Sequence, residues 1–454
     1  MNRFPSTPAC SVPRWMPATA ALLLTCLVLG GCGAPGSEQP AADPLPEVST
    51  ELGTEEVTLE VVAGSCDEAL MQGLTDAFMQ ENPQVTIDLT LDDCTQLPAN
   101  APRLMASDDP PDLIRLSTLG TAVEDGLLTN LDIYADAYGW DQLPETQLEQ
   151  LRVSDDGRTR GSGSLYGMPF GFGLTGVYYN KDKASALGMN QPPATVEEFE
   201  ALLAKAAADG ETALMASNQD GLVAYAYQGL ANQLSDRDAL AQWIYTAPGA
   251  SFDIDGTLQA AHDVQRWAEE GYFPDGVNAL NQDQVLGRFI DGEGVFYYSG
   301  NWRAATLDEQ MAGNAGFFLM PPIEAGGPRV AMSAPAGMGI PRLSDQINTA
   351  AFFLHWLQTD TARALQVQIS GLAPAGSPDQ PVPKVPAGSV SEAVLDAWQD
   401  LNESDGLIAF LADATAGINT SALVPELQLL VEGKTSPEEF VSAVQDQYAQ
   451  ELGS

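Results

Sequence analysis

The sequence predicts an α/β protein built from two lobes. Its 454 residues exceed what one compact core normally holds. From Val57 to Ile114, strand-like and helix-like segments alternate, which indicates parallel strands joined by crossover helices. The segment Leu165–Asp182 then places glycines between aromatic residues. Because glycine allows close approach and aromatic rings offer flat faces, this pattern is typical of a chain that crosses and lines a cleft.

Residues 1–31 are predicted to be a lipoprotein signal peptide. Two arginines and no acidic residue precede the apolar run Ala18–Leu29, which is too short for an ordinary membrane span. The run ends in Leu29-Gly30-Gly31-Cys32, which resembles the bacterial lipobox, where a peptidase cleaves before the cysteine and the thiol carries lipid. We therefore expect a lipid anchor at Cys32, on the outer face of the bacterial cytoplasmic membrane. A cysteine packed in a core is the alternative.

Residues 32–56 are expected to be a flexible tether, because their Pro, Ala, Gly and acidic residues cannot bury a core. Of the five cysteines, Cys10 and Cys26 would leave with the signal peptide. With Cys32 lipidated, Cys66 and Cys94 remain. An even pair outside the cytoplasm predicts a disulfide, with two free thiols as the alternative.

The charge of the chain is strongly acidic. Sixty-two Asp and Glu residues against 19 Lys and Arg give a net charge of −43. Nucleic acid is therefore excluded as a partner, because phosphate binding requires clustered Lys and Arg. The charge indicates a solvated, self-repelling surface.

The first lobe is expected to begin at Val57. The predicted strands are Val57–Ala63, Val85–Leu91 and a short one from Pro111 to Ile114, and the predicted helices are Asp67–Gln80 and Pro98–Met105. Cys66 and Cys94 follow the first two strands, whose carboxyl ends lie side by side if they are parallel, so a bridge is geometrically feasible. Ligands also gather at the carboxyl ends in open α/β sheets.

The later segments continue the alternation. Thr195 and Glu198 have the spacing of a capping box, which predicts a helix at Thr195–Ala208. Trp267 and Trp356 are expected in the core, on the apolar faces of helices. The other predicted helices are Asp255–Gly271, Gln284–Ile290, Asn348–Thr359, Glu392–Leu401 and Pro437–Gln450, and the later strands are Gly294–Tyr298 and Phe317–Met320.

Several blocks of the sequence occur in an order that is typical of one family. The longest, from Leu165, is LYGMPFGFGLTGVYYNKDKASALGMNQPPATVEEFEALLAKA. The others are Pro111-Asp112-Leu113, the stretch from EGYFPDG to FIDGEGVFYYSGNW, and FFLMPPIEAGGPRVAMSAPAGMGIP followed by AAFFLHWLQT. Over residues 57–450 the chain resembles the family 1 extracellular solute-binding proteins of ABC importers, and among these it is most similar to the sugar-binding members.

The resemblance implies a type II periplasmic-binding-protein fold, in which two α/β lobes joined by hinge crossings hold the ligand in the cleft between them. It implies crossings near Phe170–Thr175, near Met332–Ala336 and within Pro386–Val394. The N-terminal lobe would be residues 57–170 plus 336–388, and the C-terminal lobe residues 175–331 plus 394–454. Such a protein would be a monomer that captures a sugar or oligosaccharide and delivers it to ABC permease subunits.

Sugar recognition requires a flat apolar face for the ring and planar polar groups for the hydroxyls. The resemblance implies that Trp302, in the GNW turn, stacks on the sugar, and that Asn301 beside it is a further ligand contact. Gly337 and Met338 match a glycine turn that brings backbone N–H groups close to the ligand, and Ser117 follows the third strand, where the family often has a polar contact. The remaining candidate contacts are Phe170, Phe172, Trp243, Tyr225, Asp92, Asp93 and Ser65, with loop capping as the alternative for the last three.

The sequence favours a binding protein over an enzyme. Its two histidines, His262 and His355, have no metal-binding spacing, and neither GxSxG nor the phosphate-binding GxxxxGK[ST] motif occurs. We therefore expect no catalytic residues, metal or cofactor. The alternatives are a binding protein for a non-sugar solute such as a polyamine, a surface adhesion or sensor lipoprotein, and a glycosidase, for which the 62 acidic residues can supply paired carboxylates.

Overall fold

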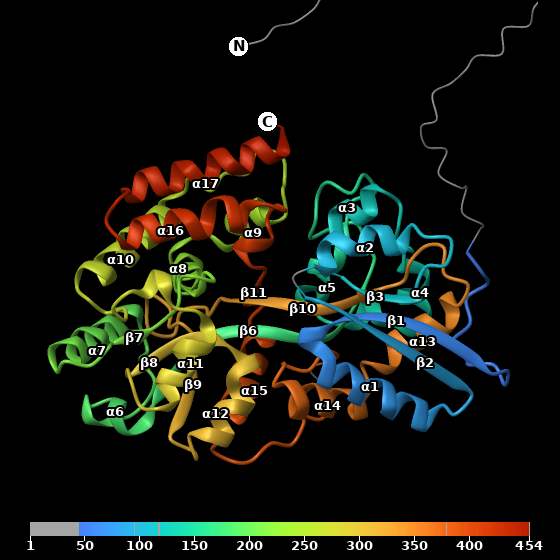
Figure 1. Ribbon diagram of the computed structural model, residues 1–454, viewed down its shortest axis with the longest axis horizontal. Helices are drawn as coiled ribbons and strands as arrows, with labels where there is room; N and C mark the ends of the chain where they lie inside the picture. The colour runs from blue at the N-terminus through green and yellow to red at the C-terminus, as the bar shows by residue number, and fades with distance from the viewer. Residues whose placement is uncertain (1–44, 95, 117–118, 378, 454) are drawn as a thin grey trace, which may run out of the picture. The chain divides into compact units, whose positions relative to one another are not determined.

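The computed structural model describes residues 45–94, 96–116, 119–377 and 379–453 of the chain. The predicted signal peptide, Cys32, the first part of the predicted tether and Ser117 lie outside the described residues. Within those ranges, no helix is long and apolar enough to span a membrane. The described part folds as a mixed α/β structure around one curled sheet (Figure 1).

The first strands pair in parallel, which confirms the prediction from the alternating segments. β1 (Val57–Gly64) pairs with β2 (Val85–Asp92) on one side and with β3 (Leu113–Arg115) on the other. The crossover helices are α1 (Glu68–Glu81) and α2 (Leu97–Met105), as expected. β3 begins at Leu113 rather than at Pro111, because the Asp112 carboxylate, not a backbone carbonyl, accepts the Glu60 N–H at 2.9 Å.

Two long antiparallel strands, β6 (Met168–Asn180) and β10 (Ala331–Gly339), run through the middle of the structure (Figure 1). The first half of β6 pairs with β10, and the second half pairs with β8 (Phe296–Gly300) and β9 (Ala315–Phe318). One hydrogen-bonded sheet therefore joins the early parallel strands to the later ones, in the order β2-β1-β3-β10-β6-β8-β7.

The hydrophobic clusters change along these two strands. Phe170 packs in the cluster that contains the side chains of β1 and α1, whereas Phe172 packs in another cluster against Trp398. On β10, Met338 belongs to the first cluster and Met332 to a third one, which contains Trp267. We call the side of the first cluster the N-terminal lobe and the side of the other two the C-terminal lobe.

The elements of the N-terminal lobe precede β6 or follow β10. In addition to those given above, they are α3 (Leu119–Glu124), α4 (Asp132–Tyr138), α5 (Glu145–Leu148), the hairpin of β4 (Arg152–Val153) and β5 (Ser164–Leu165), α13 (Ile347–Trp356) and α14 (Asp360–Ser370). Trp356 is buried in the core of this lobe, as predicted.

The C-terminal lobe holds most of the helices. They are α6 (Lys181–Ala186), α7 (Val196–Ala208), α8 (Leu222–Leu234), α9 (Arg237–Ile244), α10 (Asp255–Glu269), α11 (Gln282–Ile290), α12 (Ala304–Gln310), α15 (Val390–Glu403), α16 (Val424–Val431) and α17 (Pro437–Leu452), with β7 (Leu214–Met215) and β11 (Leu407–Ile408). Trp267 is fully buried, as predicted. The sequence did not predict α8, because most of its residues are buried and its apolar side chains form no single stripe.

The predicted capping box of α7 is displaced by one residue. The Thr195 hydroxyl accepts the Glu198 N–H at 3.2 Å, as expected for an N-cap. The Glu198 carboxylate, however, accepts the Ala194 N–H at 2.7 Å rather than that of Thr195. The reciprocal bond therefore reaches the residue before the cap, which lies in the turn leading into the helix.

The last part of the predicted tether is docked on the N-terminal lobe. The Asn348 side chain of α13 accepts the Ser49 N–H at 3.2 Å and donates to the Glu47 carbonyl at 3.0 Å. The Tyr134 hydroxyl of α4 donates to the same Asn348 oxygen at 2.9 Å. Val48 and Leu52 pack against the core of the lobe, so this short arm is held by both polar and apolar contacts.

Replacing Asn348 with alanine should release the arm while leaving the fold intact, because the lost hydrogen bonds contribute about 1 kcal/mol each. Cleavage by a glutamate-specific protease after Glu47 and Glu51 should then become several times faster. Asn190→Ala, at an exposed loop of the other lobe, is the matched control. An equal cleavage rate in Asn348→Ala and the unchanged protein would contradict this role of Asn348.

Candidate functional site

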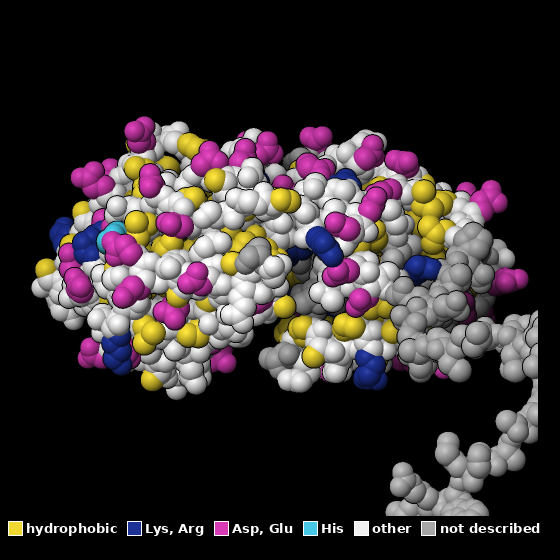
Figure 2. All heavy atoms as spheres, turned by 90° about the horizontal axis from the view of Figure 1, so that it is seen from above, with side chains coloured by type: hydrophobic (Ala, Val, Ile, Leu, Met, Phe, Trp, Pro, Cys, Tyr) yellow, Lys and Arg dark blue, Asp and Glu magenta, His cyan; other side chains and the backbone are white. Residues whose placement is uncertain are grey.

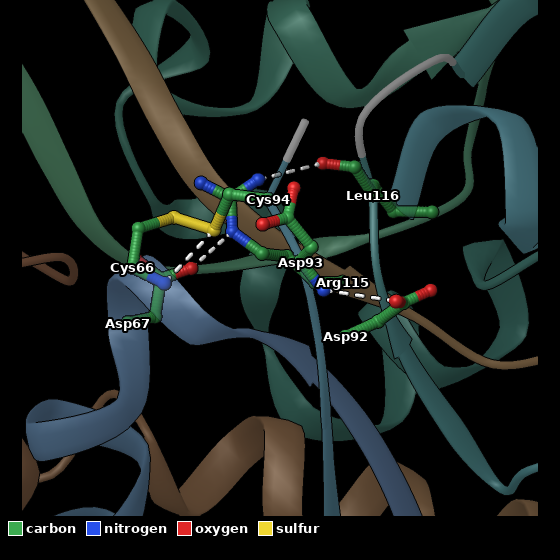
Figure 3. Close-up of a disulfide and its surroundings, with 7 residues drawn as sticks. All are labelled: Cys66, Asp67, Asp92, Asp93, Cys94, Arg115 and Leu116. Carbon is green, nitrogen blue, oxygen red and sulfur yellow. Dashed lines mark hydrogen bonds and ion pairs between the residues drawn. A yellow bond between two sulfur atoms is a disulfide. The ribbon is translucent and has the colours of Figure 1, made fainter. Parts of the chain in front are cut away.

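Polar side chains gather at the carboxyl ends of the parallel strands (Figure 3). Ser65 follows β1, Asp92 and Asp93 lie at the end of β2, and Arg115 ends β3. Parallel pairing brings these ends to one edge of the sheet, where open α/β sheets bind their ligands. Ser65 and Asp93 are exposed and Asp92 is half-buried. The structure therefore brings together three of the residues predicted from the sequence.

The Cys66–Cys94 disulfide joins the ends of β1 and β2, with its Cα atoms 6.0 Å apart. It confirms the predicted bridge over the alternative of two free thiols. Gly64 lies beside it, where a Cβ atom would come within 2.5 Å of the Cys94 sulfur. A glycine at the end of β1 is thus required for the bridge to pass over the strand.

Arg115 and Asp67 form an ion pair next to the disulfide (Figure 3). The Arg115 Nε donates to the Asp67 carboxylate, and its Nη1 donates to the Leu116 carbonyl at 3.3 Å. The sequence did not predict this pair, because its members are 48 residues apart and no motif links them. The only available signal was the position of Arg115 near Ser117, after the third predicted strand.

The Asp92 carboxylate is used within its own loop. One oxygen accepts the Asp93 N–H at 2.8 Å, and the other accepts the Asn100 side-chain amide of α2 at 2.7 Å. These are the bonds of the loop-capping alternative. Asp92 therefore shapes the turn between β2 and α2, which carries Asp93 and Cys94.

A second, aromatic group lies in the C-terminal lobe. Trp302, in the turn η5 (Asn301–Arg303) after β8, and Tyr225 of α8 have ring centroids 6.2 Å apart. Phe410 packs against Tyr225 with a centroid distance of 5.3 Å. The Trp302 ring faces β6, where a Cβ atom on Gly173 would lie 3.4 Å from it. Trp302 and Tyr225 are both half-buried.

Asn301 ties the turn that carries Trp302 to β6. Its side-chain oxygen accepts the Leu174 N–H at 2.9 Å, and its side-chain amide donates to the Phe172 carbonyl at 3.0 Å. The residue is fully buried. These two bonds fix the position of Trp302 relative to the crossing strand.

The other predicted contacts are buried in this structure. Phe172 packs against Trp398, and Trp243 stacks on Tyr448 with a centroid distance of 4.7 Å. The Gly337 carbonyl accepts the Leu116 N–H at 2.9 Å, as part of the sheet edge. The buried candidates are Phe170, Phe172, Trp243, Gly337 and Met338.

Two carboxylates act electrostatically on Tyr225. Burial, followed by the nearby Asp413 and Asp220 carboxylates, raises the pKa of Tyr225 to about 12, so its hydroxyl is a hydrogen-bond donor at neutral pH. Desolvation also raises the pKa of Asp413, which the Arg160 guanidinium opposes. Acidic side chains are also spread over the face shown in Figure 2, whereas Lys and Arg are few. Among the described residues, no group of three or more His, Cys, Asp or Glu side chains could hold a metal ion.

Side chains of the N-terminal lobe contact α9 of the C-terminal lobe. The Glu149 carboxylate accepts the Tyr245 hydroxyl at 3.0 Å and lies 3.4 Å from the Arg237 guanidinium. Arg160, in the β4–β5 hairpin, donates from its Nη2 to the Ile244 carbonyl at 2.8 Å. Glu149 thus reaches from the N-terminal lobe to both ends of α9, and Arg160 reaches its last residue.

Comparison with known sequences shows to which family the chain belongs. The sequence profile of the family described as bacterial extracellular solute-binding protein matches residues 73–381. The chain belongs to this family. No curated protein sequence matches this solute-binding protein.

Solved structures with the same fold cover nearly all of this solute-binding protein. A chitin oligosaccharide binding protein has a TM-score of 0.71 at 17% identity and covers 88% of this chain and 100% of its own. A family 1 extracellular solute-binding protein from Bifidobacterium longum subsp. infantis has a TM-score of 0.69 at 18% identity, with 87% and 100% covered. The solute-binding protein RafE, in complex with raffinose, has a TM-score of 0.66 at 18% identity, with 87% and 99% covered. The predicted type II periplasmic-binding-protein fold is confirmed.

The Glu149 contact predicts a pH dependence of stability. Desolvation raises the pKa of Glu149, and Arg237 and the Tyr245 hydrogen bond only partly oppose it. Because the folded protein then holds this proton more tightly than the unfolded chain, the free energy of unfolding should fall as pH rises from about 4.3 through the raised pKa. Glu149→Gln should lack this fall in a series of melting temperatures from pH 4 to pH 7.

The matched control for this series is Glu197→Gln, at an exposed position of α7. It should keep the pH profile of the unchanged protein. If Glu149→Gln and the unchanged protein lose stability equally over this range, the raised pKa of Glu149 is wrong.

Proposed function

We propose that this solute-binding protein captures a sugar or oligosaccharide in the cleft between its lobes and delivers it to the permease of an ABC importer. The observation that carries the proposal is the partly accessible Trp302 ring, held by its neighbour Asn301 beside β6 and flanked by Tyr225. A sugar ring presents C–H groups on its flat face, and an accessible indole in a crowded site is the surface that such a face packs against.

Polar groups that suit hydroxyls lie near this ring. The Tyr225 hydroxyl can donate, and the exposed Asp413 carboxylate, whose charge acts on Tyr225, can accept. On the N-terminal lobe, Ser65 and Arg115 offer further hydrogen-bonding groups at the strand ends, and Asp93 lies beside them. A neutral ligand with many hydroxyls would use both kinds of group at once.

The polar strand ends and the aromatic group lie beside the same strand, β10. Arg115 pairs with Met338 on β10, and Gly173, next to Trp302, pairs with Ala334 on the same strand. Four residues of extended strand separate these two positions, which is about 13 Å. We propose lobe boundaries at residues 57–170 plus 336–388 and 175–331 plus 394–454, with the ligand selecting and stabilising a closed arrangement.

The sugar-binding proteins among the structural neighbours support a sugar ligand. They include a chitin oligosaccharide binding protein, a receptor with exclusive preference for β-D-galactopyranose, and RafE with raffinose. At 17–18% identity they share the fold with this chain, so the sugar itself is to be found by experiment. The family profile that matches the chain is one of solute-binding proteins, which supports a binding role rather than catalysis.

We further propose that the mature protein is a monomer anchored through lipid on Cys32, on the outer face of the membrane. Cys32 follows a lipobox-like sequence, and the profile that matches the chain is that of an extracellular family. Metabolic labelling with a palmitate analogue should mark the unchanged protein and leave Cys32→Ala unmarked. Labelling of both proteins would contradict the anchor.

Trp302→Ala should weaken sugar binding by tenfold to a hundredfold, because stacking an indole face contributes about 1.5–3 kcal/mol. The ligand would first be found by thermal shift with raffinose, galactose, chitin oligosaccharides, amino acids and spermidine. Saturation at a hundredfold excess over Kd stabilises the fold by about 2.7 kcal/mol. Isothermal titration then gives Kd for each variant.

Trp302→Phe should keep part of the affinity, and Ile323→Ala, at an exposed apolar position, should keep all of it. Full affinity in Trp302→Ala would contradict the stacking role. If spermidine raises the melting temperature and no sugar does, the proposed ligand is a polyamine and not a sugar.

A further inference from the structure

The disulfide, Asp67 and Arg115 form a connected rim at the ends of β1, β2 and β3 (Figure 3). The disulfide joins the turn η1 (Ser65–Asp67) to the end of β2. Asp67, the last residue of that turn, accepts a hydrogen bond from Arg115 at the end of β3. A single chain of contacts therefore links the three strand ends.

The disulfide and the Arg115 side chain both lie over Gly64. A Cβ atom there would lie 2.5 Å from the Cys94 sulfur, 3.4 Å from the Cys66 sulfur and 3.7 Å from the Arg115 Cδ. The sulfur bridge and the stem of Arg115 thus pack over the same point of β1. The position of the bridge therefore limits the space that is open to the Arg115 stem.

The Arg115 side chain is held on one edge and accessible elsewhere. Its Nε donates to Asp67 and its Nη1 to the Leu116 carbonyl, yet 24% of the side chain remains exposed. The Asp67 side chain is only 14% exposed, so it serves the guanidinium rather than the solvent. Such a fixed guanidinium loses little rotamer freedom when it binds a ligand.

We infer that Arg115 is a ligand contact of the N-terminal lobe, and that Asp67 and the Cys66–Cys94 disulfide are its positioning residues. The inference rests on the proposed function and deepens it. Because Asp67 already neutralises the guanidinium in a chain of net charge −43, Arg115 acts as a donor to neutral hydroxyls, and the ligand is a neutral sugar rather than a sugar acid.

The test is a double-mutant cycle read by isothermal titration, with whichever of raffinose, galactose or chitin oligosaccharide stabilises the unchanged protein. Arg115→Met should raise Kd about tenfold or more, and Arg115→Lys should recover part of the loss. Asp67→Asn should raise Kd about threefold to tenfold. If Asp67 acts through Arg115, the double variant should bind no more weakly than Arg115→Met alone, within twofold.

The disulfide is tested in the same way. Cys66→Ser with Cys94→Ser should lower the melting temperature, because the unfolded chain loses a cross-link. At a temperature where the fold is intact, it should also raise Kd threefold to tenfold, and it should have no further effect on Kd in Arg115→Met. Arg329→Met, the same change at an exposed loop of the C-terminal lobe, is the control and should leave Kd unchanged.

The outcomes separate the inference from the proposed function. Sugar binding that survives Arg115→Met within twofold would overturn the contact and leave the function standing. Effects of Asp67→Asn or of the serine variants that simply add to that of Arg115→Met would overturn the positioning. Tighter binding of galacturonate than of galactose would overturn the inference that the ligand is neutral. If no member of the panel binds the unchanged protein, the proposed function itself fails.

Discussion

The antiparallel pairing of β6 with β10 is the constraint on which the rest of the structure depends. Both strands pass from one set of hydrophobic cores to the other, and their backbone hydrogen bonds make a single sheet of the two lobes. The first half of β6 therefore belongs with the polar strand ends, and the second half with the aromatic group. Each part of the site is positioned by the same pair of strands.

The two parts of the site are built by different means. At the strand ends of the N-terminal lobe, a covalent bridge and an ion pair fix polar groups that need an exact direction. In the C-terminal lobe, the position of Trp302 follows from the two hydrogen bonds of Asn301 and from contact with Gly173. Under the proposed function, the directional donors would select the ligand's hydroxyl pattern and the flat apolar face would select its ring.

Local patterns in the sequence predicted the features that short-range interactions determine. The first three strands, their two helices and the Cys66–Cys94 bridge follow from periodicity and from the parallel pairing that it implies. The Arg115–Asp67 pair was not predictable, because it depends on how the strand ends meet in space. Aromatic residues beside glycines are equally typical of a cleft and of a core, and the sequence of β6 does not distinguish the two. The structure places Phe170 and Phe172 in cores and leaves Trp302 partly accessible.

The hydrogen bonds of Asn301 also restrict where the molecule can bend. They fasten Phe172 and Leu174 to the C-terminal lobe, so β6 beyond this point moves with that lobe. Just before it, Gly171 has a φ of 145°, and on the partner strand the register shifts between Pro335 and Gly337. If one lobe rotates against the other, we expect these two paired strands to bend at this irregular step. Trp302 lies next to this step and would then move only a short distance. Residues far from the step would move furthest.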